Sequence, residues 1–291
     1  MPLTQTRTFR VRYYECDAYG HVNNANYLRY MQEAAFDATA AAGYDFARYE
    51  EMGCYWVTRE TDIEYLRPLR YGDTVDVKTW VHSFERVRSR RQYELRRPGE
   101  SELAARAYTD WAFVEKATGR PARIPQGMVA AFFPDGERPD PPRRERMPEP
   151  PPAPEVFRLR RRVEWHEIDT ARMVNNPVYA SWAEDAGAQA VAHFSWPIAR
   201  MVATGFGLVA RHTRVEYYEP AVWGDEVEIA TWCHGARRSS ASRVFLITRT
   251  RDGAFLARVT TLGVCIEIAT GRPMRFPADF IAALEPNLAR A

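Results

Sequence analysis

Apolar and polar positions alternate in some segments of the chain and follow a helical spacing in others. Over 25–42 the apolar residues recur at helical spacing and are mostly small, which predicts a helix held close against a sheet. Asn23 or Asn24 suits the N-cap of this helix, and Gly43 suits its end. Alternation and β-branched or aromatic residues predict strands in five segments, at 8–16, 55–66, 74–84, 89–96 and 103–115.

This pattern occurs twice. Shifting the chain by 152 residues places Val22-Asn23-Asn24 on Val174-Asn175-Asn176 and, much later, Thr118-Gly119-Arg120-Pro121 on Thr270-Gly271-Arg272-Pro273, without a gap. A match that keeps one register over such a span indicates a duplicated domain. We therefore predict an α+β protein with two tandem domains. Each domain has one strand, one long central helix and a four-stranded antiparallel meander that wraps the sheet around the helix.

A proline-rich stretch separates the two copies. Residues 134–154 include Pro-Asp-Gly-Glu-Arg-Pro-Asp-Pro-Pro and Pro-Glu-Pro-Pro-Pro-Ala-Pro, which favour an extended, semi-rigid linker. The predicted boundaries are 1–133 for the first domain, 134–154 for the linker and 155–291 for the second domain.

The amino-acid composition argues against nucleic-acid-binding and membrane-spanning proteins. With 46% hydrophobic and 13% aromatic residues in 291, each copy can bury a core. A formal net charge of +2 is too small to indicate nucleic-acid binding. No apolar run approaches membrane-spanning length, and the first residues contain no apolar segment. We expect a soluble cytoplasmic protein that binds neither membrane nor nucleic acid.

The four cysteines show no metal-binding or disulfide pattern. Cys16, Cys54, Cys233 and Cys265 are each replaced by an apolar residue in the other copy. We therefore expect them to be small buried hydrophobic residues rather than ligands or catalytic thiols.

The turn before the first helix is the best candidate for chemistry. Asp17 follows a predicted strand and precedes a helix N-terminus, whose N–H groups carry partial positive charge. A carboxylate beside such donors can attack an acyl group or activate water while the amides stabilise the carbonyl oxygen. The alternative is an aspartate that only caps the turn or helix.

Two strings in the first copy resemble a known family. Asp17-x-x-Gly-His-Val-Asn-Asn-x-x-Tyr27 and Glu64-Tyr-x-x-Pro-x-x-x-Gly-Asp73 resemble the hotdog-fold thioesterases. The chain is similar to the 4-hydroxybenzoyl-CoA thioesterase group and to the acyl-ACP thioesterases, which carry two hotdogs in one chain. The resemblance covers nearly all of the first copy and, more weakly, the second.

The resemblance implies roles for the residues of this turn. Asp17 is the implied catalytic carboxylate, as nucleophile or general base, and the Asn24 amide is implied to polarise the thioester carbonyl. His21 resembles the histidine of the acyl-ACP pattern Asp-x-Asn-x-His, although Tyr19 stands where that pattern has asparagine. Further substrate contacts are expected from Tyr19, Gly20, Asn23, Tyr27 and Asn176.

The second copy keeps the aspartate but changes its surroundings. Asp169 matches Asp17, whereas Arg172 replaces Gly20 and Met173 replaces His21. Pro177 replaces Ala25, which a first helical turn tolerates. We expect Asp169 to be a weaker or silent acid. Two working sites with different acyl preferences are the alternative.

Other polar residues have two interpretations each. Glu64 and Glu216 match within strands, where they could be catalytic or only exposed or hydrogen-bonded. Glu33 and Asp185 match on the central helix, where some hotdog enzymes place an acid, although we favour an exposed helix face. His82 and His234 match but lack metal-ligand spacing. Arg88 and Arg90 lie in an arginine-rich strand, which could hold the phosphates of CoA or the acidic surface of a carrier protein, or could be a solvated strand face.

Together these features predict a tandem hotdog thioesterase that hydrolyses an acyl-CoA or acyl-carrier-protein thioester. No bound cofactor or metal is expected, because CoA or acyl carrier protein is part of the substrate. The resemblance implies that the two copies form an intrachain pseudo-dimer that completes the Asp17 site. The sequence does not determine whether the chain also forms a homo-oligomer. Two alternatives are a hotdog acyl-CoA hydratase or dehydratase, and a non-catalytic acyl-CoA-binding module.

Overall fold

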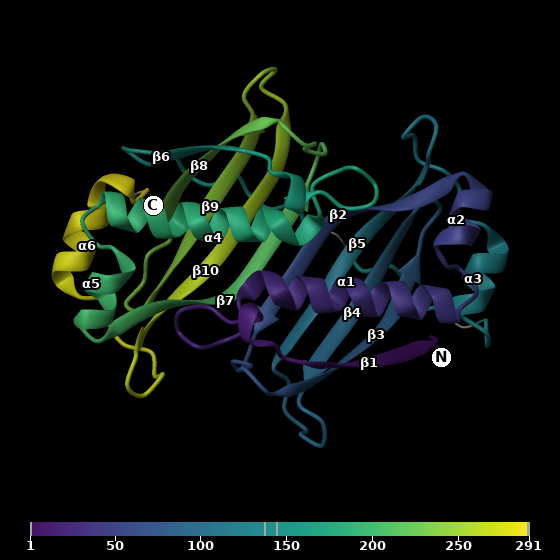
Figure 1. Cartoon of the computed structure of the whole chain (residues 1–291), viewed down its shortest axis with the longest axis horizontal. Helices are drawn as coiled ribbons and strands as arrows, with labels where there is room; N and C mark the ends of the chain where they lie inside the picture. Colours follow the sequence, from purple (N-terminus) through teal and green to yellow (C-terminus); the bar gives the residue numbers. More distant parts are fainter. Residues whose placement is uncertain (1, 137, 144, 290–291) are drawn as a thin grey trace. The chain divides into compact units, whose positions relative to one another are not determined.

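The chain folds into two compact units with the same architecture. The computed structural model describes residues 2–136, 138–143 and 145–289. The units are Met1–Glu145 and Arg146–Ala291. Each has an antiparallel sheet and a long helix that lies across one face of that sheet (Figure 1). The predicted α+β class is confirmed.

In the first unit, described strands pair in the order β1-β3-β4-β5-β2, every neighbour antiparallel. The strands are β1 (Thr4–Arg10), β2 (Cys54–Tyr65), β3 (Thr74–Phe84), β4 (Arg88–Arg96) and β5 (Ala105–Glu115). The helical elements are η1 (Tyr13–Glu15), α1 (Asn24–Ala41), α2 (Phe46–Met52) and α3 (Gln126–Phe132). The predicted helix and the four strands of the meander are confirmed to within about two residues at each end, the usual uncertainty of element boundaries.

The second unit repeats this order as β7-β10-β9-β8-β6. Its strands are β6 (Phe157–Arg162), β7 (Phe206–Tyr217), β8 (Glu226–His234), β9 (Ser240–Arg249) and β10 (Phe255–Glu267). Its helical elements are η2 (Trp165–Glu167), α4 (Asn176–His193), α5 (Ile198–Ala203), α6 (Ala278–Leu284) and η3 (Glu285–Asn287).

Small residues let the central helix approach the sheet. Ala25 and Ala34 of α1 are fully buried, and Ala186 of α4 occupies the position equivalent to Ala34 and is also fully buried. On the sheet, Val75 and Val77 of β3 are likewise inaccessible to solvent. A larger side chain at these alanines would have to displace packed neighbours, so the small-residue face predicted from the sequence sets the depth of the core.

The first predicted strand is partly wrong. Residues 8–16 were expected to be extended, but β1 ends at Arg10 and the chain turns through η1. The cause is Glu15, whose Oε2 accepts hydrogen bonds from the Arg12 main-chain N–H (2.7 Å) and the Tyr30 hydroxyl (2.7 Å). The buried carboxylate bends the chain back toward α1. Strand β1 therefore ends at Arg10, although the residues that follow have a strand-like composition.

The second unit begins within the segment expected to be a linker. Met147 is buried, and its carbonyl accepts a hydrogen bond from Arg258 Nη2 at 3.2 Å. The Trp232 indole N–H donates to the Pro151 carbonyl at 2.8 Å. Residues 147–151 are therefore attached to the second unit by specific contacts.

The cysteines are free thiols in the described structure. Cys265 is buried as expected, but Cys16, Cys54 and Cys233 are only partly buried, which corrects the prediction of full burial. Cys16 borders the exposed turn at residues 17–21, where solvent reaches it.

Candidate active site

The Asp17 turn is a closed loop held by its own main chain. A bridge between Cys16 and Val22 closes its base, and Gly20 adopts a left-handed conformation with φ of +75°. The Asp17 N–H donates to the His21 carbonyl at 2.7 Å, and the Gly20 N–H donates to the Asp17 carbonyl at 3.0 Å. Glycine suits this position because a side chain disfavours positive φ.

The Asp17 carboxylate is oriented by main-chain amides. Its Oδ1 accepts the N–H groups of Tyr19 (2.9 Å) and His21 (3.1 Å). Such a turn is what the capping interpretation predicts. The side chain is only half-buried, and no described residue donates a hydrogen bond to Oδ2. One oxygen therefore fixes the orientation while the second can meet water or a substrate.

The helix N-terminus begins two residues after the turn. Asn23 is the N-cap, and its Oδ1 accepts the Ala25 N–H at 3.0 Å. Asn24 is the first residue of α1, and its carbonyl accepts the Tyr65 hydroxyl at 3.3 Å. Asn24 thus lies where the helix dipole places its positive end.

Two tyrosines of the family-like strings position this terminus. The Tyr27 hydroxyl accepts the Leu69 N–H at 3.1 Å, and the Tyr27 ring meets Tyr65 edge-on with centroids 5.3 Å apart. Burial raises the pKa of Tyr27 to about 12, so the hydroxyl stays protonated. Tyr27, expected to contact substrate, has a structural role here, and a substrate contact stays a prediction.

Glu15 lies beneath the turn and was missed by the sequence analysis. Its carbonyl accepts the Asn23 N–H (2.9 Å) and the Asn26 side-chain amide (2.8 Å). The second unit has Glu167 at the same place, where Trp182 Nε1 donates to Oε1 at 2.8 Å. A sequence signal for Glu15 does exist. Glu15 matches Glu167 in the second copy, and each glutamate lies fifteen residues before the aromatic residue that donates a hydrogen bond to it.

His21 lies beside Asp17 and is half-buried. Burial lowers its pKa, the positive charge of Arg70 lowers it further, and Asp17 opposes both. The imidazole is therefore neutral near pH 7 and can accept or donate a hydrogen bond.

The second unit repeats the turn with one strained residue. Asp169 Oδ1 accepts the Ala171 N–H at 2.8 Å, and the Asp169 N–H donates to the Met173 carbonyl at 2.9 Å. Arg172, at the position of Gly20, keeps a left-handed φ of +62°. Burial raises the pKa of Asp169, and the amides of Ala171 and Met173 oppose this.

The second helix N-cap lacks the hydrogen bond made in the first. Asn175 is equivalent to Asn23, but Pro177 stands where Ala25 provides an N–H in the first unit. The Asn175 Oδ1 is buried and has no hydrogen-bond partner among the described residues. The two helix termini therefore differ chemically although their backbones match, and Asn176 begins α4 as Asn24 begins α1.

The arginine-rich strand is largely occupied by internal contacts. Arg90 forms a two-pronged ion pair with Asp110 at 2.7 and 2.8 Å, and its guanidinium stacks 3.8 Å from the Tyr108 ring centroid. Arg91 is buried, and burial lowers its pKa. Arg88 is exposed. Of the two arginines expected to bind phosphates, only Arg88 is presented to solvent.

The remaining matched acids pair with basic or polar neighbours. Arg258 Nη2 lies 2.6 Å from Glu216, and Arg106 Nε lies 2.5 Å from Glu64. Glu33 is exposed and pairs with Arg7 at 3.3 Å. Asp185 is exposed and accepts from Gln189 at 2.9 Å. The surface interpretation of these helix acids is confirmed, and both strand glutamates form cross-strand ion pairs.

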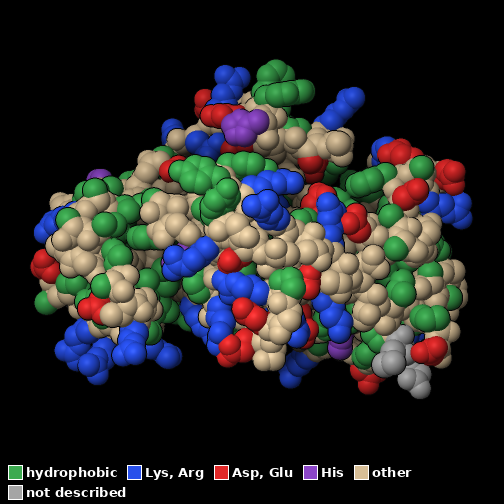
Figure 2. Space-filling view, turned by 60° about the horizontal axis from the view of Figure 1, so that its bottom comes forward, with side chains coloured by type: hydrophobic (Ala, Val, Ile, Leu, Met, Phe, Trp, Pro, Cys, Tyr) green, Lys and Arg blue, Asp and Glu red, His purple; other side chains and the backbone are tan. Residues whose placement is uncertain are grey.

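The described residues show no metal site and no membrane-spanning helix, and their surface charges are mixed. On the face shown in Figure 2, basic and acidic side chains are interspersed, in keeping with the net charge of +2. Within the described residues, no group of three or more His, Cys, Asp and Glu side chains is arranged to bind a metal. No helix in that part of the chain is both long and apolar enough to cross a membrane.

Comparison with known proteins assigns the family. Residues 11–132 and 163–284 each match the sequence profile of the Thioesterase-like superfamily. The chain belongs to this superfamily. Both matches lie within the two units, so this superfamily member carries the domain twice in tandem, as the internal repeat predicted.

Curated relatives support this assignment. The chain is 28% identical over 118 residues to the "Putative acyl-CoA thioesterase YneP" of Bacillus subtilis, covering 40% of this chain and 85% of that protein. It is 24% identical over 192 residues to the chloroplastic acyl-[acyl-carrier-protein] hydrolase FATB2 of Cuphea viscosissima. That match covers 60% of this chain and 45% of the plant protein, so it spans about half of the relative's length.

A solved structure shows the fold over nearly the whole chain. The crystal structure described as an "oleoyl thioesterase (putative)" from Lactobacillus plantarum aligns with a TM-score of 0.77 and 19% identity. The alignment covers 90% of this chain and 96% of that one. The predicted fold, two tandem hotdog domains, is confirmed.

Proposed function

We propose that this protein hydrolyses an acyl thioester, of CoA or of a carrier protein, to the free acid and the thiol. The observation that carries the proposal is the Asp17 carboxylate, which main-chain amides orient through one oxygen in the turn that precedes α1. Membership of the Thioesterase-like superfamily supports this reaction class.

Each group in the turn has a part in the proposed reaction. Asp17 Oδ2 either accepts a proton from water as the water oxygen attacks the thioester carbon, or attacks that carbon itself. The positive end of α1 at Asn24 stabilises the negative carbonyl oxygen of the tetrahedral intermediate. Collapse of the intermediate breaks the carbon–sulfur bond and releases the thiolate, which takes up a proton. The neutral His21 hydrogen-bonds the substrate or this water.

Two routes follow from the two roles of Asp17. In the general-base route the water oxygen enters the product acid directly. In the nucleophilic route a mixed anhydride forms, and water then attacks either its aspartyl or its acyl carbonyl. Incorporation of ¹⁸O from labelled water into the peptide that contains Asp17, after many turnovers, supports the nucleophilic route. Neither route needs a bound cofactor, because CoA or carrier protein belongs to the substrate.

The decisive experiment compares Asp17→Asn with Asp169→Asn on a panel of acyl thioesters, with thiol release as the readout. Asp17→Asn removes the charge with almost no change in shape, and we expect kcat to fall by ~10²–10⁴. Asp169→Asn should cost far less, because the second unit lacks the Gly-His pair of the first turn.

Circular dichroism and thermal unfolding serve as controls that both variants fold. A folded Asp17→Asn protein that keeps more than about a tenth of the wild-type kcat lies outside the range for a lost general base and rejects Asp17 as the catalytic acid. Equal losses in the two variants would reject the asymmetry between the units.

A further inference from the structure

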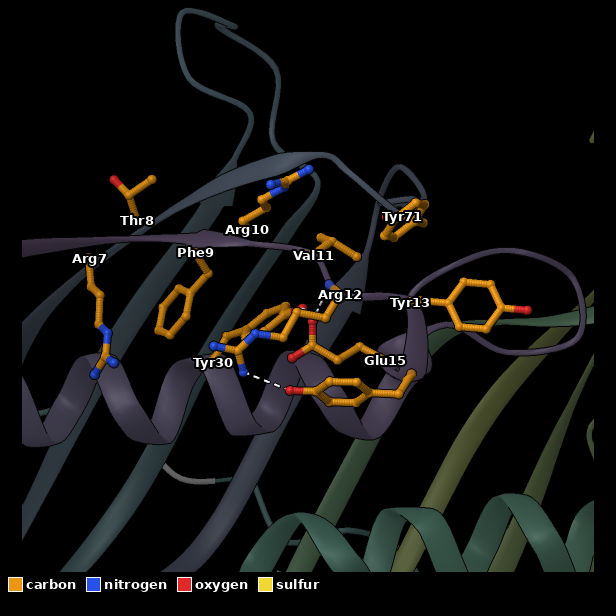
Figure 3. Close-up of a pocket in the computed structure, with 11 residues that line it drawn as sticks. Arg7, Thr8, Phe9, Arg10, Val11, Arg12, Tyr13, Glu15, Tyr30 and Tyr71 are labelled. Atoms are coloured by element: carbon orange, nitrogen blue, oxygen red, sulfur yellow. Dashed lines mark hydrogen bonds between the residues drawn. The ribbon is translucent and has the colours of Figure 1, made fainter.

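The first unit contains a groove between β1 and the start of α1. Its volume is about 570 Å³, which is within the usual range of small-ligand pockets. Its lining includes Arg10, Arg12, Tyr13 and Tyr71. Figure 3 shows Glu15 and Tyr30 between β1 and α1, at the floor, while Arg10 extends from the opposite side of β1 and Tyr13 projects outward. None of the residues expected to be catalytic lines this groove. We call it the β1–α1 groove.

The rim combines cations with exposed aromatic rings. Arg10 and Arg12 are exposed, and no described carboxylate lies within ion-pair distance of either guanidinium. Arg12 Nη1 donates to the Tyr14 hydroxyl at 2.8 Å. Tyr13 and Tyr71 are 80% and 61% exposed, and their rings meet edge-on with centroids 5.9 Å apart. Exposed rings beside exposed cations that form no salt bridge fit a ligand that has both a flat ring and negative charge.

The acid on the floor is hydrogen-bonded within the unit and lies beneath the exposed arginines. Both hydrogen bonds to Glu15 Oε2, from the Arg12 N–H and the Tyr30 hydroxyl, hold the carboxylate inside the unit. The side chain is only 9% exposed. Its carboxylate is therefore held in place by hydrogen bonds within the unit, and the groove presents Arg10 and Arg12 to solvent.

The second unit shows which features are particular to the first. Trp165 and Trp223 repeat the exposed edge-on pair, with centroids 5.5 Å apart. At the position of Phe9, however, Arg161 lies 4.9 Å over the Trp182 ring and forms an ion pair with Glu167.

One of the two rim charges also reverses between the units, whereas Arg162 matches Arg10. Glu164 stands at the position of Arg12 and lies 3.4 Å from His166. In the second unit a cation thus lies over the floor, and Glu164 stands beside Arg162 at the rim. The aromatic pair is common to both units, whereas the exposed Arg12 belongs to the first alone.

We infer that the β1–α1 groove binds the phosphorylated adenosine end of a CoA thioester. Arg10 and Arg12 pair with its phosphates, and the purine stacks on Tyr13 and Tyr71. The inference rests on the proposed thioesterase function and assigns its substrate class, because a carrier-protein thioester has no adenosine.

The groove is adjacent to the turn expected to be catalytic. Glu15 contributes its carboxylate to the floor and its carbonyl to the N–H of Asn23, the N-cap of α1. Asp17 follows Glu15 by two residues. The pantetheine arm therefore runs from the groove along η1 to the Asp17 turn, and the nucleotide and the thioester occupy neighbouring parts of one unit.

The test measures nucleotide binding separately from catalysis. Adenosine 3′,5′-bisphosphate, the nucleotide part of CoA, is titrated calorimetrically into the full-length protein and its variants. We expect Arg12→Glu, which introduces the acid found at position 164, and Tyr13→Ala each to weaken binding by about tenfold or more. Arg10→Glu gives a second, independent charge reversal. The matched controls in the second unit, Arg162→Glu and Trp165→Ala, should bind as the wild type does.

A kinetic comparison then connects the groove to the substrate. The ratio of kcat/KM for an acyl-CoA to that for the same acyl-pantetheine should fall by about tenfold in Arg12→Glu. Arg12 and Tyr13 are exposed, so these variants should unfold at the wild-type temperature.

The failures of the two proposals are distinguishable. If thioesters are hydrolysed but the bisphosphate binds weakly or equally to the wild type and Arg12→Glu, the groove assignment is overturned and the thioesterase stands. If binding depends on Arg12 but no thioester is cleaved, the groove assignment stands and the thioesterase fails. A loss in Arg12→Glu confined to carrier-protein thioesters would assign the groove to the carrier protein and overturn the nucleotide.

Discussion

The first turn of the central helix shows how one residue alters a helix cap. In α1 the side chain of Asn23 accepts the Ala25 N–H, whereas Pro177 offers no N–H to Asn175 in α4. Asn23→Ala should therefore lower the free energy of unfolding by about 1 kcal/mol, and Asn175→Ala by much less. Urea unfolding of the two variants measures the difference. Equal losses would show that the Asn23 hydrogen bond adds nothing to stability.

The protonation of His21 should make the stability of the protein depend on pH. The lowered pKa of His21 in the folded protein means that the unfolded chain binds more protons as pH falls. The neutral imidazole therefore supports folding above its ordinary pKa of about 6.5, and this support is lost as pH falls from there. His21→Gln cannot titrate, so its stability should fall less than that of the wild type between about pH 7.5 and 5. Parallel slopes for both proteins would contradict the prediction.

The turn that carries Asp17 in the first unit and Asp169 in the second has the same backbone shape in both, but the conformational strain differs. Gly20 and Arg172 both have positive φ, and only glycine adopts it without a side-chain penalty. We expect Gly20→Ala to destabilise the protein by about 1 kcal/mol and Arg172→Gly to stabilise it by up to a similar amount. Thermal unfolding measures both. A destabilised Arg172→Gly protein would mean that the arginine side chain makes a contact that offsets the strain.

The strength of the hydrophobic periodicity explains which helices and strands could be predicted. The meander strands and the central helix have strong periodicity, and the sequence places them within about two residues. η1 has no such periodicity, because its conformation depends on the Glu15 carboxylate reaching Arg12 and Tyr30. The short helices α2 and α3 were not predicted, since they are too brief to show a helical repeat.

For the molecule as a whole, the boundary between the units determines which fragments are stable. A fragment that begins at Glu155 lacks Met147 and Pro151, leaving Trp232 Nε1 and the Arg258 guanidinium without these partners. We expect it to be less stable by about 1–3 kcal/mol than a fragment that begins at Arg146. Chemical unfolding of both fragments tests this. Equal stability would show that residues 147–151 act only as a linker.

The duplication, the α+β class and the turn in which a carboxylate precedes a helix N-terminus can all be inferred without the structure. These follow from periodicity, a constant shift between matched residues and local turn chemistry, all of which are properties of neighbouring positions. A resemblance carried by the same residues pointed to the superfamily to which the chain belongs.

The roles of individual polar residues, by contrast, depend on contacts that form when the chain folds. Arg90 pairs with Asp110 across the sheet, Tyr27 holds the Leu69 N–H, and Arg12 stands exposed while Arg161 is held by Glu167. Arg90 and Tyr27 contact residues that are far away in the sequence. Arg12 and Arg161 lie in equivalent segments of the two units but have different surroundings. A side chain's role depends on whether folding brings it a partner, and spacing along the chain does not specify that.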